Sequence, residues 1–251
     1  MSALTPDAAV ASAREKSMPL SWWLAPAVLL AALLLLEMTD VDRAVSRWFY
    51  DAGTHAFPLR HTFVFDTVLH HWTKYAVILV SSMAIAAWLF TYIFPALQSQ
   101  RHRLLFLALA LSLAPLTVSA LKLVTNRPCP WDFADYGGAI PYTHLFERSA
   151  PHARGQCFPA GHASTGFALL GFFFAAHHAR RRNLARAALL LGLAGGIALG
   201  MGRVAQGAHF ASHVLWSGLV CWLVMLALYR LLLTPAPVPE AVAGESFQLS
   251  G

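Results

Sequence analysis

The chain has 251 residues, of which 57% are hydrophobic and only 12% are charged. Soluble domains carry roughly 25% charged residues, so this composition excludes an ordinary soluble protein, and the supply of apolar residues excludes a disordered one. Three cysteines and sixteen glycines without a repeat exclude disulfide-dense and collagen-like chains. An integral membrane protein remains, and its net charge of +6 suits anionic lipid headgroups rather than nucleic acid.

Six stretches of the chain are apolar enough to cross a bilayer, which takes about 20 mostly apolar residues in a helix. We therefore expect an all-α fold, a polytopic membrane protein with six transmembrane helices in one domain over residues 1–251. The stretches are 20–38, 75–95, 104–124, 162–176, 187–202 and 213–233. The fourth and fifth are short for complete spans. No small-x-small cleavage site follows the first, which predicts an uncleaved helix.

Arginines in short loops predict the orientation in the membrane. They are dense at residues 101–103 and 180–186, on the side that also holds both chain ends. This places the tails 1–19 and 234–251 in the cytoplasm, and the loops 39–74, 125–161 and 203–212 outside. We expect one or two amphipathic pieces in the first loop and an irregular, proline-rich second loop between helices three and four.

Several ionisable residues fall at the outward ends of the predicted helices. One Lys or Arg at the centre of a membrane helix costs roughly 2.5–3.5 kcal/mol, so these groups need a reason to be there. Three cations and three imidazoles at one depth predict a pocket for an anion, most simply phosphate. They are Lys122, Arg127, His162, Arg203, His209 and His213.

The segment before the fourth stretch supports a phosphate pocket. Pro159, Ala160 and Gly161 lead with little bulk into a helix start at His162. Backbone N–H groups at such a start bind phosphate oxygens, and a histidine there can exchange a proton with the bound group. The alternative is a helix cap beside an interfacial histidine.

His209 and His213 are four residues apart and share a helix face. Three interpretations are open: two interfacial histidines, a zinc pair, or a nucleophilic imidazole oriented by the other. The basic neighbourhood and the lack of an obvious third ligand disfavour a metal, so no cofactor is expected.

In three motifs the sequence resembles the type 2 phosphatidic acid phosphatase superfamily, and its membrane-associated bacterial branch in particular. The family motifs are K-x6-R-P, P-S-G-H and S-R-x5-H-x3-D. The resemblance covers about residues 75–233 and predicts a bacterial inner membrane protein whose active site faces the periplasm. The corresponding residues here are Lys122, Arg127 and Pro128, then 159–162, then Arg203, His209 and His213.

Four positions depart from the family pattern. Cys129 stands at the family arginine, with Arg127 two residues earlier, while Ala160 and Gly202 replace two serines. His213 replaces the aspartate that orients the nucleophilic histidine. Neutral His213 can accept a hydrogen bond but supplies no negative charge. Asp132 in the outward loop is a second candidate for the missing carboxylate.

The resemblance implies a lipid phosphate phosphatase. His209 attacks phosphorus to form a phosphohistidine, and His162 protonates the leaving oxygen. Three cations, with N–H groups near Gly161, hold the phosphate oxygens: Lys122, Arg127 and Arg203. Two alternatives stay open: a phosphotransferase that passes the phosphoryl group to another lipid, and a degenerate site that only binds lipid phosphate. Neither the lipid nor the oligomeric state follows from the sequence.

Cys129 and Cys157 both fall in the second outward loop. A periplasmic loop is in an oxidising compartment, which predicts a disulfide between them that closes the loop carrying the first two motifs. The alternative is a pair of buried thiols.

Overall fold

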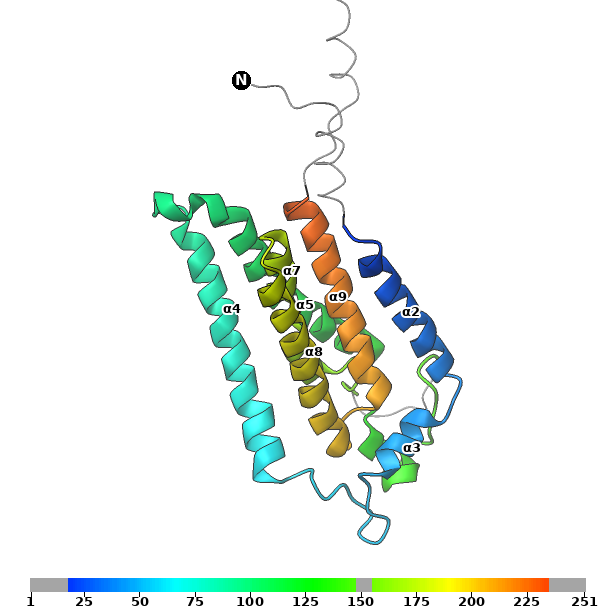
Figure 1. The fold of residues 1–251 in the computed structure, drawn as a ribbon. Coiled ribbons are helices and arrows are strands. Elements are labelled where there is room, and N and C mark those ends of the chain that lie inside the picture. The colour runs from blue at the N-terminus through cyan, green and yellow to red at the C-terminus, as the bar shows by residue number, and fades with distance from the viewer. Residues whose placement is uncertain (1–17, 148–154, 235–251) are drawn as a thin grey trace, which may run out of the picture.

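The computed structural model describes residues 18–147 and 155–234 (Figure 1). All of the secondary-structure elements in the described residues are helices, which confirms the expected all-α class. The predicted tails lie almost wholly outside the described residues. The main helices are α2 Ser21–Leu36, α3 Val41–Arg47, α4 Thr73–Phe90, α5 Arg101–Thr125, α6 Gly161–Phe167, α7 Leu170–His178, α8 Arg182–Ala205 and α9 Ala211–Leu232.

Long apolar helices indicate a membrane protein. In the described part of the chain, three helical segments are long and apolar enough to cross a bilayer: Pro95–Asp132, Arg182–Ala205 and Ala211–Leu232. Helices α2 and α3, bent by 78°, make a fourth if they count as one broken span. Length and composition therefore support three to four spans, not clearly the six expected.

Two of the expected spans differ from the prediction for local reasons. The stretch 162–176 is divided into α6 and α7, because backbone bonds such as Leu169 N–H to Gly166 O, 3.1 Å, and Gly171 N–H to Ala168 O, 3.0 Å, tighten the chain between them. Its halves have seven and nine residues, too short to span separately. The second stretch forms only a short apolar helix over Tyr75–Phe90.

The two loops predicted to face outward, 39–74 and 125–161, contain short helical elements. In 39–74 these are α3 and a π-helix, Val64–Trp72, that runs into α4. The loop 125–161 contains two 3-10 turns, Pro130–Asp132 and Ala134–Tyr136, and is otherwise irregular where it is described. Phe57, Phe133, Tyr136 and Phe210 form a buried aromatic cluster that packs these loops together.

Helices α4 and α2 lie on opposite flanks of the bundle, packed on α5 and α9 (Figure 1). The main core fills the space between, where the Trp22 ring of α2 meets the rings of Phe174 at 4.8 Å and Tyr229 at 5.2 Å. The α5–α6 and α8–α9 junctions lie at one end of the bundle, beyond the core.

Helix α8 packs closely through Gly192, Gly196 and Gly200, which recur every four residues and so share one helix face. A Cβ atom at Gly196 would lie 2.3 Å from the Phe167 ring, and one at Gly200 would lie 2.4 Å from Val214. Glycine therefore lets α6 and α9 approach α8 at van der Waals distance.

Helix α3 is tied to α9 through Asp42. Its carboxylate accepts hydrogen bonds from the N–H, at 2.9 Å, and the hydroxyl of Ser212. A carboxylate at a helix N-terminus satisfies an otherwise unpaired N–H and complements the helix dipole. This contact holds the outer segment against the start of α9, where His213 lies.

Gly196→Ala should lower the free energy of unfolding by about 1–3 kcal/mol, because the added methyl group overlaps the buried Phe167 ring. Gly195→Ala is the matched control, since a Cβ there lies 3.8 Å from the nearest atom, Gly166 Cα. Thermal unfolding in detergent measures both. Equal midpoints for the two variants would contradict the packing described.

Candidate active site

Residues from two helix junctions, α5–α6 and α8–α9, lie near one another at one end of the bundle. Lys122 lies in the last turn of α5, His162 in the first turn of α6, and Arg203 in the last turn of α8. His209 lies in the turn between α8 and α9, and His213 in the first turn of α9. The residues of the three motifs therefore lie on elements that meet at this end of the bundle.

A tight turn positions His209. Gly207 has a φ of +74°, and its Cβ would lie 2.3 Å from the ring of Phe57, so both backbone conformation and space require glycine. The Gly207 carbonyl accepts a hydrogen bond from the Trp131 N–H at 3.1 Å, which joins this turn to the loop 125–161. His209 follows two residues later and is only 3% exposed.

Both site imidazoles donate to one backbone carbonyl. His209 Nδ1 lies 2.6 Å and His213 Nδ1 lies 2.7 Å from the oxygen of Cys157. A carbonyl only accepts, so each Nδ1 carries the hydrogen, and in a neutral ring Nε2 keeps its lone pair. The ring orientation of His209 is therefore set by Cys157, not by His213 or Asp132.

His209 is held in its neutral form. Burial lowers the pKa of His209 well below its ordinary value. The neighbouring His213 and Lys122 lower this pKa further, and Arg203 does so more weakly, whereas the bond to the Cys157 carbonyl opposes the shift. Neutral His209 has the unprotonated nitrogen that a nucleophile needs.

The Cys157 carbonyl is fixed from several directions. A disulfide joins Cys157 to Cys129, with Cα atoms 5.1 Å apart. The Cys157 N–H donates to the Arg127 carbonyl at 3.1 Å, and the Thr125 hydroxyl donates to the Phe158 carbonyl at 2.6 Å. The end of α5 thus positions the acceptor of both histidines.

Lys122 reaches the start of α6. A Cβ on Gly161 would lie 3.4 Å from Lys122 Nζ, so the ammonium group lies beside this residue and His162 follows directly. The Ala160 N–H, expected to bind phosphate, donates instead to the His213 carbonyl at 3.2 Å. At the start of α6, Gly161 is therefore the residue that lies beside a cation, Lys122.

Arg203 is positioned by a glutamine. Its Nη1 donates to Gln206 Oε1 at 2.6 Å, and Gln206 Nε2 donates to the Arg60 carbonyl at 2.9 Å. Gln206 is almost fully buried. The sequence analysis did not identify Gln206 as a site residue. Its signal in the sequence is its position about one helical turn after Arg203.

Arg127 and Asp132 have hydrogen-bond partners within the loop 125–161. The Arg127 guanidinium donates to the carbonyl oxygens of Glu147, at 2.7 Å, Thr143, at 3.1 Å, and His144. Asp132 accepts from the Cys129 N–H at 2.8 Å. The structure thus shows both side chains as loop supports, and it does not show them joined to His209.

Among the described residues, no group of three or more His, Cys, Asp or Glu side chains is placed to hold a metal ion. His209 and His213 point their Nδ1 atoms at the same carbonyl, with ring centroids 6.1 Å apart. The third interpretation expected one imidazole to orient the other; instead, the Cys157 carbonyl orients both rings.

His209→Asn should weaken the dependence of stability on pH. Because the folded pKa of His209 is lowered, the unfolded chain binds more protons as the pH falls below about 6.5. The stabilising contribution is complete above that pH and is lost as the pH falls toward the folded pKa. Thermal midpoints at about pH 7.5 and about pH 5.5 measure this. The midpoint should fall less in the variant, and an equal fall in both proteins would contradict the assignment.

One of three comparisons with known proteins finds a match. A family model described as the PAP2 superfamily matches residues 103–235, more than half of the chain. It starts later than the resemblance expected at residue 75, and it contains all three motifs. No curated protein and no solved structure matches. The chain belongs to the PAP2 superfamily, which implies phosphatase-type activity on phosphate esters.

Proposed function

We propose that the protein hydrolyses a phosphomonoester or pyrophosphate on a membrane lipid headgroup through a phosphohistidine at His209. The observation that carries this proposal is the hydrogen bond from His209 Nδ1 to the Cys157 carbonyl. It fixes the tautomer in which Nε2 bears the lone pair, on a buried ring beside two cations. Superfamily membership supports the phosphatase chemistry.

In the first step, His209 Nε2 attacks phosphorus and a P–N bond forms as the P–O bond to the leaving group breaks. His162 gives its proton to the leaving oxygen. The phosphorylated imidazole is cationic, and the carbonyl of Cys157 receives its Nδ1–H in a stronger, charge-assisted bond. In the second step, His162 takes a proton from water, oxygen bonds to phosphorus, and the P–N bond breaks to release inorganic phosphate.

Lys122 and Arg203 stabilise the charge that spreads over the three non-bridging phosphate oxygens. Their placement supports this role, because both lie close enough to lower the pKa of His209. The ammonium group of Lys122 and the guanidinium group of Arg203 both act on the same buried imidazole, so the site is positively charged, which suits a phosphate dianion. Arg127 contributes by holding residues 143–147, some of which line one small cavity together with His213.

A lipid substrate is proposed because the site lies at one end of an apolar bundle (Figure 1). Arg101, Arg103 and the cluster 180–186 lie at the other end. By the positive-inside rule, this supports a proposed topology in which that end is cytoplasmic and the site faces the periplasm from a bacterial inner membrane. In this topology α4 and the α6–α7 pair supply the remaining crossings, six in all.

His209→Ala should reduce phosphate release by at least about a thousandfold, because the variant lacks the nucleophile. His162→Ala should reduce it by about 10²–10⁴-fold through loss of proton transfer. Purified protein is tested with phosphatidic acid, phosphatidylglycerol phosphate, undecaprenyl pyrophosphate and a lipid A phosphate.

His102→Ala is the matched control, because His102 is an exposed histidine at the far end of α5. Acid-labile, alkali-stable radiolabel on the wild-type protein identifies the phosphohistidine. Label that passes to a lipid alcohol instead of water would identify a phosphotransferase. Full release by His209→Ala would refute the mechanism.

A further inference from the structure

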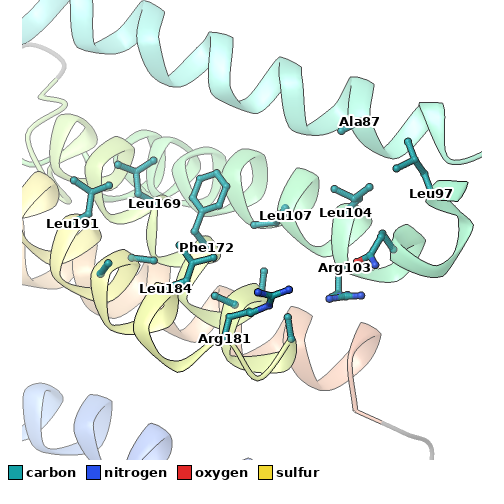
Figure 2. Close-up of a pocket in the computed structure, with 16 residues that line it drawn as sticks. Ala87, Leu97, Arg103, Leu104, Leu107, Leu169, Phe172, Arg181, Leu184 and Leu191 are labelled. Atoms are coloured by element: carbon teal, nitrogen blue, oxygen red, sulfur yellow. The ribbon is translucent and has the colours of Figure 1, made fainter.

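A cavity lies away from His209 and His213. It has a volume of about 610 Å³ and lies between the α4–α5 pair and the α7–α8 pair (Figure 2). Most of its lining is alanine, leucine and phenylalanine, including Leu104, Leu107, Leu169 and Leu191. Leu191 is 62% exposed, so this space is a groove on the outer surface of the bundle.

The polar lining of the groove is confined to one end. It consists of Gln100, Arg103 and Arg181, and no carboxylate lines the described groove. Arg103 is in the first turn of α5 and Arg181 immediately precedes α8, so both lie at the end of the bundle opposite His209 (Figure 1). In Figure 2 their guanidinium groups lie at the same end, with Leu169 and Leu191 at the other.

These two parts match the chemistry of one class of ligand. An apolar groove along membrane helices accommodates an acyl chain, whereas paired guanidinium groups bind phosphate oxygens through parallel hydrogen bonds. Basic pockets between membrane helices bind anionic lipid headgroups for this reason. A neutral lipid would leave the two positive charges without a partner of opposite charge.

We propose that this groove binds an anionic phospholipid of the surrounding membrane, with an acyl chain along the leucines and the headgroup phosphate between Arg103 and Arg181. The bound lipid is distinct from the substrate, whose phosphate meets His209 at the other end of the bundle. This site does not depend on the proposed phosphatase activity.

Native mass spectrometry of the delipidated protein in detergent tests the proposal. Phosphatidylglycerol and phosphatidylcholine with identical acyl chains are added in equal amounts. Wild-type protein should retain about tenfold more phosphatidylglycerol than phosphatidylcholine. The Arg103→Gln/Arg181→Gln variant should retain the two lipids equally. Arg186→Gln/Arg230→Gln removes two exposed charges near the same end but outside the groove, and it should behave as wild type.

Ala187→Phe tests the apolar half of the site. Ala187 is an exposed residue that lines the groove, so phenylalanine there fills it without removing a charge. Retention of phosphatidylglycerol should fall severalfold, with an unchanged thermal midpoint as the check on folding.

Equal retention of the two lipids by wild type, an equal loss in the Arg186/Arg230 control, or unchanged retention in Ala187→Phe would each overturn the proposal. A dimer that disappears in Arg103→Gln/Arg181→Gln would overturn it in favour of a second copy of the chain as occupant. Because lipid retention is read without hydrolysis, an inactive protein would not affect this test.

Discussion

The carbonyl oxygen of Cys157 accepts hydrogen bonds from Nδ1 of both His209 and His213, and the candidate site depends on this contact. It sets the tautomer of His209 and so leaves Nε2 with the lone pair that the proposed attack requires. The carbonyl is held in turn by the disulfide to Cys129 and by a backbone bond to Arg127. The irregular loop therefore has a structural task, which is to carry one acceptor to the start of α9.

A carbonyl in place of the family carboxylate changes the electrostatics of the site. It carries only a partial negative charge, so it stabilises an imidazolium less than an aspartate would. Burial, Lys122 and Arg203 keep the pKa of His209 low. His209 is therefore neutral, and the groups around it are positively charged. This charge distribution disfavours protonation of His209 and favours binding of a phosphate dianion.

The cationic residues at the two ends of the bundle have different surroundings. Lys122 and Arg203 converge on buried imidazoles, whereas Arg103 and Arg181 end an apolar groove. Between the ends, α8 has glycine where Phe167 and Val214 pack against it, so α6 and α9 pack closely. This close packing brings the α5–α6 and α8–α9 junctions near enough to form one site.

The all-α class, the apolar character, the glycine face of α8 and the motif residues were determined by the sequence alone, because each depends on local composition or short spacing. The break between α6 and α7, the buried Gln206 and the loop contacts of Arg127 and Asp132 were decided by the tertiary structure. So was the acceptor of His209, for a physical reason: every residue has a backbone carbonyl, so no side-chain pattern marks the one at Cys157. Only the packing of residues 52 positions apart selects it.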